Sequence, residues 1–140
     1  MAEAPSLLKR QIDVAPGVRV ILVDSITQVA VDDAGAIVVA ASHGGRSSAA
    51  FTMTVPLAAI FFNDAGVGKD NAGIAALEAL QERDIPAGTV AHTSARIGDA
   101  LDMWEQGVLS HVNAAAMRRG YAPGARLADA VMACTAAVSG

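Results

Sequence analysis

The sequence predicts an α/β fold in which a mainly parallel sheet is flanked by helices in a Rossmann-like layered architecture, with a helical C-terminal third. Two observations predict it. Short continuous apolar runs, such as VRVILV (18–23) and LAAIFF (57–62), are typical of strands that are buried on both faces. These runs alternate with amphipathic stretches such as 71–84, in which the apolar side chains share one helical face. Alternating strands and helices favour parallel pairing.

The first part of the chain is expected to contain few helices. Residues 1–16 show no clear periodicity and are expected to form an irregular segment. A buried strand follows at 18–23. The stretch 28–42 contains Asp-Asp-Ala-Gly at 32–35, which predicts a hairpin turn between two short strands. Such a hairpin would make the sheet mixed.

The remaining elements follow from the same periodicities. The stretch 47–55 is expected to form a helix ended by Pro56, with a strand as the alternative because of its Thr and Val content. In order, we then expect a strand at 57–62, a helix at 71–84, a strand at 88–93, and helices at 98–106, 110–120 and 125–138. In the helix at 110–120, Ser110 is expected to be the N-cap and His111 to have no chemical role.

Length and composition limit the function classes. The 140 residues suggest one α/β domain spanning 1–140. Charged residues make up only 17% and hydrophobic residues 53%, which favours a homo-oligomer. The net charge of −4 and the lack of a basic patch argue against nucleic acid. Because we find neither a secretory signal nor an apolar run of ~18 residues, we expect a cytoplasmic protein without a membrane partner.

Polar residues begin abruptly where three of the predicted strands end. Ser42–Gly45, Asn63–Gly66 and His92–Ser94 each follow an apolar run. In open parallel sheets, the carboxyl ends of the strands meet at one edge, and ligands bind there. The sequence therefore predicts one shared site built from the three segments.

The residue types at these breaks indicate acid–base or hydrolytic chemistry, such as that of a hydrolase or lyase, on a small carboxylate or amide. His43 and His92 titrate near neutral pH, and Asp64 can orient a histidine or accept a proton. Ser42 completes the expected catalytic group. The expected substrate-binding residues are Gly44, Gly45, Asn63, Gly66, Lys69, Ser94 and Arg96. No cofactor or metal is required by this hypothesis.

A serine hydrolase is one alternative. Ser42, Asp64 and His92 follow one another in the order Ser…Asp…His of α/β-hydrolases, and AASHG (40–44) resembles the G-x-S-x-G turn with alanine in place of the first glycine. Against this alternative, the chain is short for that fold and has no HGGG-type loop.

Two further alternatives remain open. His43, Asp64 and His92 form a set of metal-ligand types, although no local ligand spacing such as H-E-x-x-H is present. A non-catalytic ligand-sensing or scaffold subunit needs the same edge of the sheet but no titrating pair. Nucleotide binding is disfavoured, because the phosphate-loop pattern fails at Asn63 and Asp70.

Overall fold

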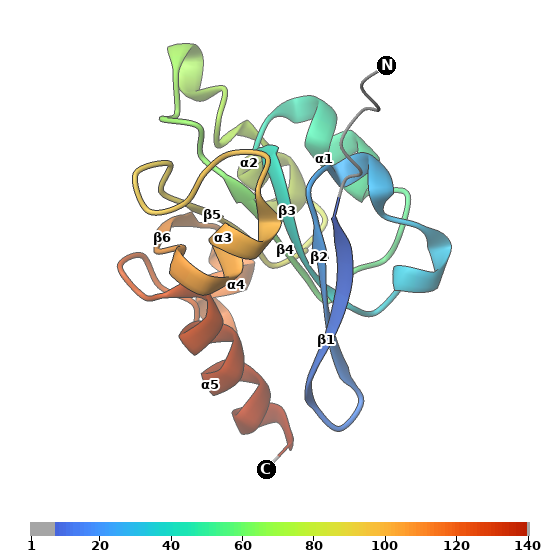
Figure 1. Ribbon diagram of the computed structural model, residues 1–140. Helices are drawn as coiled ribbons and strands as arrows, with labels where there is room; N and C mark the ends of the chain where they lie inside the picture. The colour runs from blue at the N-terminus through green and yellow to red at the C-terminus, as the bar shows by residue number, and fades with distance from the viewer. Residues whose placement is uncertain (1–7, 140) are drawn as a thin grey trace, which may run out of the picture.

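The computed structural model describes residues 8–139, except for the side chains of Asp70 and of residues 136–139. Six strands form one sheet in the order β1-β2-β3-β4-β5-β6 (Figure 1). The strands are β1 (Lys9–Ala15), β2 (Val18–Val23), β3 (Ile37–His43), β4 (Ala59–Asn63), β5 (Ala87–Val90) and β6 (Leu109–Val112). Pairing is parallel from β2 to β5, and β1 and β6 are antiparallel edge strands. The predicted α/β fold with a mainly parallel, mixed sheet is confirmed. The strand order has no reversal of the kind found in the Rossmann order 3-2-1-4-5-6.

Helices cover both faces of the sheet. They are α1 (Arg46–Thr52), α2 (Ala75–Gln81), α3 (Ala100–Gln106), α4 (Ala114–Arg118) and α5 (Leu127–Ser139). One apolar cluster joins α1 and α2 to Val38, Ile60 and Phe62, and a second joins α3 and α5 to the opposite face at Val39 and Phe61. Because successive strand residues point to opposite faces, both sets must be apolar, which explains the continuous apolar runs.

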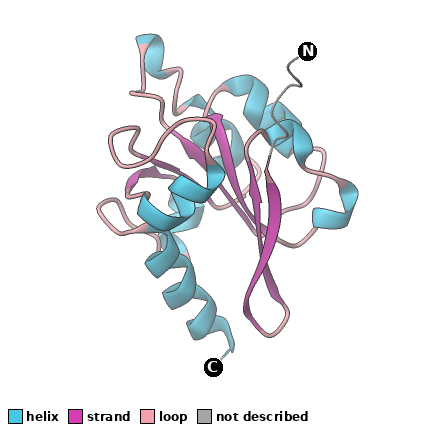
Figure 2. Cartoon of the chain, in the orientation of Figure 1, coloured by secondary structure: helices cyan, strands magenta, loops and turns pink. Residues whose placement is uncertain are grey.

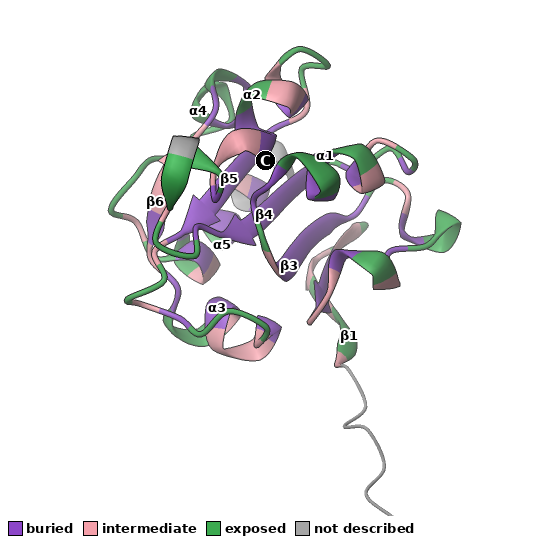
Figure 3. Cartoon of the chain, turned by 90° about the horizontal axis from the view of Figure 1, so that it is seen from above, coloured by how far each residue is buried: buried purple, intermediate pink, exposed green. Residues whose placement is uncertain are grey.

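The direction of the loops after β4 and β5 creates a crevice. The chain passes from β4 to α2 on one face of the sheet, but from β5 to α3 on the other face. Figure 3, seen from above, shows α1 and α2 on one side of the buried strands and α3 on the other. Ligands of open α/β sheets bind where neighbouring connections separate in this way. None of the helices described is long and apolar enough to cross a membrane.

The N-terminal part of the chain differs from the prediction. Residues 9–15, expected to be irregular, form β1, and the hairpin lies between β1 and β2 (Figure 2). The half-buried Ile12 and Val14 alternate with exposed Gln11 and Asp13, which is the pattern of an edge strand with one solvated face.

The hairpin predicted between two short strands at Asp-Asp-Ala-Gly is wrong, because only the second of them, β3, is a strand, and it pairs parallel to β2. Short 3-10 turns at Ile26–Gln28 and Val31–Asp33 connect them instead. The buried Asp33 carboxylate fixes this connection. It accepts hydrogen bonds from the Ala30 N–H at 2.8 Å and from Lys9 Nζ at 2.9 Å.

The C-terminal third is not entirely helical, because β6 lies between α3 and α4. Ser110 and His111 belong to this strand, and Asn113 caps α4 by accepting a hydrogen bond from the Ala116 N–H at 2.9 Å. The same carbonyl oxygen of Asn113 accepts a bond from the Ala87 N–H at 3.0 Å. Asn113 is therefore held by the neighbouring β5, a tertiary contact that fixes the helix start three residues later than expected.

The loops after β3 and β4 pack backbone against backbone. The Ala76 N–H donates to the Gly44 carbonyl at 2.8 Å, and the Gly44 N–H donates to the Asn63 carbonyl at 3.1 Å. A Cβ atom on Gly44 would lie 2.6 Å from the carbonyl oxygen of Gly73, and one on Gly73 would lie 1.8 Å from that of Asp64. Only glycine permits this approach.

Gly44→Ala is therefore expected to destabilise the fold by about 1–3 kcal/mol, the usual cost of overpacking against groups that cannot move aside. Gly45→Ala is the matched control, since a Cβ there would meet the movable His43 ring. We expect it to cost less than about 1 kcal/mol. Urea denaturation measures both, and equal losses for the two variants would contradict the close approach.

Candidate functional site

Asp64 and His92 meet in the crevice between β4 and β5. One carboxylate oxygen of Asp64, Oδ1, accepts hydrogen bonds from the Gly66 N–H at 2.8 Å and the His92 N–H at 3.0 Å, and lies 3.3 Å from His92 Nδ1. The Asp64 side chain is 6% exposed and the His92 side chain 53% exposed. Because Asp64 occupies Nδ1, Nε2 is the ring nitrogen available to a ligand.

The surroundings of Asp64 favour its charged form. Burial opposes ionisation and raises the pKa of Asp64. The Gly66 N–H, the Ser110 hydroxyl, and the backbone and imidazole of His92 outweigh burial, so the pKa lies below its ordinary value. Asp64 is therefore ionised at neutral pH, and orients His92 rather than acting as an acid.

Asn63 links the loops that carry this pair. Its side chain is fully buried. Its Oδ1 accepts a bond from the Ala65 N–H at 2.8 Å, and its Nδ2 donates to the Ala95 carbonyl at 2.9 Å. Both ends of the amide are used within the protein, so Asn63 positions the two loops and does not present its amide to a ligand as expected.

The loop after β4 is strained. Ala65 and Val67 have φ values of 51° and 67°, and the intervening Gly66 has 80°. A positive φ is costly for a β-branched residue such as Val67, and such residues cluster at functional sites. Bonds from the Val67 N–H to the Asp64 carbonyl and from the Gly73 N–H to the Val67 carbonyl, both of 2.6 Å, hold the loop. A Cβ atom on Gly66 would lie 3.5 Å from His92 Cε1, so the loop passes close to the imidazole.

Ser42 is engaged elsewhere. Its Oγ accepts a hydrogen bond from the Ile26 N–H at 2.9 Å, which ties the end of β3 to the 3-10 turn at Ile26–Gln28. Ser42 also lies within β3, not on a sharp strand-to-helix turn. Two members of the serine triad considered above, Asp64 and His92, are hydrogen-bonded to each other. The third, Ser42, is hydrogen-bonded to Ile26 instead.

His43 lies in a cationic depression beside this pair. Its Cα pairs with that of Asn63 in the sheet register, which places it next to the start of the strained loop. The depression has a volume of about 510 Å³ and is lined by His43, Gly45, Arg46, Ser47, Lys69, Ala72 and Ala75. Among the side chains that the structure describes, Arg46 and Lys69 have no ion-pair partner. The depression therefore carries two cationic side chains that no described carboxylate pairs with.

Ser94 and Arg96 lie in the loop from β5 to α3, on the other side of the crevice. The Ser94 hydroxyl donates to the Ala91 carbonyl at 2.7 Å and accepts from the Val108 N–H at 2.9 Å, so it closes a turn. The Arg96 N–H donates to Asp102 at 2.9 Å and the residue is exposed. The described contacts join neither residue to Asp64 or His92.

The metal alternative lacks a ligand cluster. Within the described part of the chain, no group of three or more His, Cys, Asp or Glu side chains is arranged to hold a metal ion. His43, Asp64 and His92 therefore do not form the considered metal-ligand set, since only Asp64 and His92 contact each other.

A polar cluster that the sequence analysis missed lies behind Asp64. Thr89, Ser110 and His111 on β5 and β6 are joined by short polar contacts, and Ser110 contributes to the low pKa of Asp64. The sequence predicts a helix start at Ser110 and His111, because a four-residue edge strand carries too little periodicity to reveal them.

The chain matches no protein-family model, and neither the curated proteins nor the solved structures include one with significant similarity to it. The function must therefore be argued from the geometry of the site.

Asp64→Asn is expected to lower the free energy of unfolding by about 1–3 kcal/mol near neutral pH, because the buried donors lose a charged acceptor. The pKa of Asp64 is lowered by folding, so its stabilisation is complete above the pKa of the unfolded carboxyl and is lost as the pH falls through the folded value. The difference between wild type and variant should therefore shrink as the pH falls through and below 3.8, the ordinary pKa of the carboxyl. Urea denaturation across this range measures it, with the exposed Asp32→Asn as the control; a difference independent of pH would contradict the assignment.

Proposed function

We propose that the protein binds a small carboxylate or amide metabolite at the carboxyl edge of the sheet, and that it is an enzyme whose Asp64–His92 pair performs acid–base or hydrolytic chemistry on it. The hydrogen-bonded pair in the crevice is the observation that carries the proposal. A buried ionised carboxylate that fixes one nitrogen of a half-exposed imidazole is the arrangement required of a general base.

The neighbouring depression supports an anionic ligand. Arg46 and Lys69 line it together with His43 and have no described ion-pair partner. Local positive charge in a chain of net charge −4 is the opposite of the average surface. A carboxylate bound between these cations would neutralise them, with the rest of the ligand extending towards the crevice.

The pair supplies a proton-transfer step. With Nδ1–H directed to Asp64, the Nε2 lone pair of His92 accepts a proton from the ligand or from a water molecule that attacks it. Asp64 stays ionised and stabilises the imidazolium that forms. The proton then returns from Nε2 to the leaving group. A hydrolase and a lyase both use such an exchange.

A sensor needs the depression but neither the titrating pair nor the strained loop that supports it. We infer an enzyme because the Asp64–His92 pair and the strained loop are present at one site. Backbone strain of this kind is common at catalytic centres. The alanine-rich, charge-poor composition supports assembly into a homo-oligomer, and the net charge of −4 argues against nucleic-acid partners.

A thermal-shift screen with acetate, succinate, acetamide and phosphate tests the binding step. A ligand present at about 100 times its Kd should stabilise the protein by about 2.7 kcal/mol. We expect at least one carboxylate or amide to do so, and Lys69→Ala to abolish the shift. Arg83→Ala, which removes an exposed charge at the end of α2, is the matched control. No shift from any of these compounds would overturn the proposed site.

Each stabilising ligand is then incubated with the protein, and its conversion is followed by NMR. His92→Gln should retain the thermal shift and lose conversion, because the amide keeps the bulk of the ring but cannot exchange protons. Binding without conversion by the wild type would indicate the sensor instead of the enzyme.

A further inference from the structure

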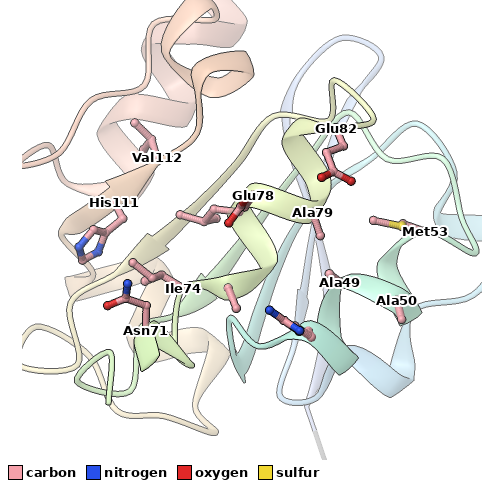
Figure 4. Close-up of a pocket in the computed structure, with 13 residues that line it drawn as sticks. Ala49, Ala50, Met53, Asn71, Ile74, Glu78, Ala79, Glu82, His111 and Val112 are labelled. Atoms are coloured by element: carbon pink, nitrogen blue, oxygen red, sulfur yellow. The ribbon is translucent and has the colours of Figure 1, made fainter. Parts of the chain in front are cut away.

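A groove runs between α1 and α2 on the face of the molecule next to the proposed site. It has a volume of about 650 Å³, within the range of ligand sites. Figure 4 shows His111 and Asn71 together at one end, Met53 and Glu82 at the other, and Glu78 between them. Four alanines line it: Ala49, Ala50, Ala75 and Ala79. Their small side chains leave the space between the two helices open.

His111 is held at the end of this groove by a bulge in β6. The register between β5 and β6 shifts between Thr89 and Val90, because His111 pairs with Thr89 and Leu109 with Val90. Ser110 is therefore the extra residue of the bulge. Neighbouring strand residues normally point to opposite faces, but His111 Nδ1 lies 3.1 Å from Ser110 Oγ. Bulges redirect side chains in this way, often next to active sites.

The hydroxyl groups around His111 leave one ring nitrogen free. Thr89 Oγ1 is 2.9 Å from Ser110 Oγ and 3.5 Å from His111 Nδ1, and Thr89 is fully buried. The Ser110 hydroxyl has one proton, which it donates either to the Thr89 carbonyl at 3.3 Å or to Asp64, and in both cases its oxygen can accept a bond from His111 Nδ1–H. Nε2 of His111 is then the acceptor that the imidazole presents to the groove, since His111 is among the lining residues.

The two walls of the groove carry opposite charges. Arg46 belongs to α1, whereas Glu78 belongs to α2 and Glu82 is the C-cap residue of α2. None of the three forms an ion pair with another described side chain. A ligand with a single charge would be attracted by one wall and repelled by the other. A ligand with both charges, separated by a short apolar chain, satisfies both walls and the alanine floor.

We propose that this groove binds a small amino-carboxylate, with its carboxylate at Arg46, its ammonium group at Glu78 and its reacting or hydrogen-bonding centre at His111. Ser110 and Thr89 act as positioning residues for the imidazole. The assignment goes beyond the proposed function, because it adds a second site and a second histidine. The two sites adjoin at Arg46 and Ala75, which line both the groove and the cationic depression.

NMR titration of the full chain tests the ligand class. The probes are glycine, β-alanine, 4-aminobutyrate and 5-aminopentanoate, with butyrate and butylamine as single-charge controls. At least one amino-carboxylate should shift the ring resonances of His111 and the amides of Ala49 and Ala79, and bind at least about tenfold more tightly than either control. Equal binding of butyrate and 4-aminobutyrate, or no binding by any amino-carboxylate, would overturn the proposal.

Two variants separate this site from the first. Glu78→Gln should weaken the amino-carboxylate by about tenfold or more, whereas Glu105→Gln, at an exposed glutamate of α3, should not. Because Glu78 does not line the cationic depression, Glu78→Gln should also leave unchanged the thermal shift that acetate or succinate produces by binding there. Loss of that shift alone would count against the proposed function and not against the groove.

The tautomer of the His111 ring is read from its ¹⁵N chemical shifts at a pH at which the imidazole is neutral. Wild type should show one tautomer, with the proton on Nδ1, and Ser110→Ala should convert it to a mixture while the amide spectrum shows a folded protein. An identical mixture in both proteins would refute the positioning role.

Sedimentation of the wild type and of Glu78→Gln tests whether a second copy of the chain covers the groove. A wild-type dimer that Glu78→Gln dissociates would show that it does, and would overturn the ligand assignment.

Discussion

The buried carboxylate of Asp64 is the interaction on which the candidate site depends. Its Oδ1 receives the N–H groups of Gly66 and His92 and faces the His92 imidazole, so one atom fixes the loop after β4, the loop after β5 and a titrating side chain. These loops leave the sheet towards opposite faces. Among the described residues, Asn63 and backbone hydrogen bonds also join the two segments that border the crevice, but they do not reach the His92 ring.

The sheet supplies the rigidity that this arrangement needs. Both faces of β3 and β4 are covered by apolar clusters, and the glycines at 44 and 73 let the two loops pack without side chains between them. Strain in the loop after β4 is therefore supported by a close-packed scaffold. Ser110 also favours the ionised form of this carboxylate and contacts His111. Polar groups of two adjoining cavities thus share a common support.

The sequence was sufficient for those parts whose signal is local and repetitive. Continuous apolar runs revealed β2 and β4, and the rule that parallel strands end at one edge brought Asp64 and His92 together. It did not reveal that Ser42 accepts a hydrogen bond from Ile26, because a position at a strand end does not say which way the side chain points. It also failed for β6, where a four-residue strand and its bulge depend on pairing with β5. Edge strands and bulges are set by tertiary contacts that periodicity does not contain.

The most direct test is the tautomer of His92, measured from its ring ¹⁵N shifts in the wild type and in Asp64→Asn. The account predicts that the neutral wild-type ring carries its proton on Nδ1, facing the carboxylate, with Nε2 unprotonated and free to accept a proton. In the variant this preference should be lost. A wild-type ring protonated on Nε2, or one whose tautomers are unaffected by the substitution, would show that Asp64 does not orient His92 and would contradict the central claim.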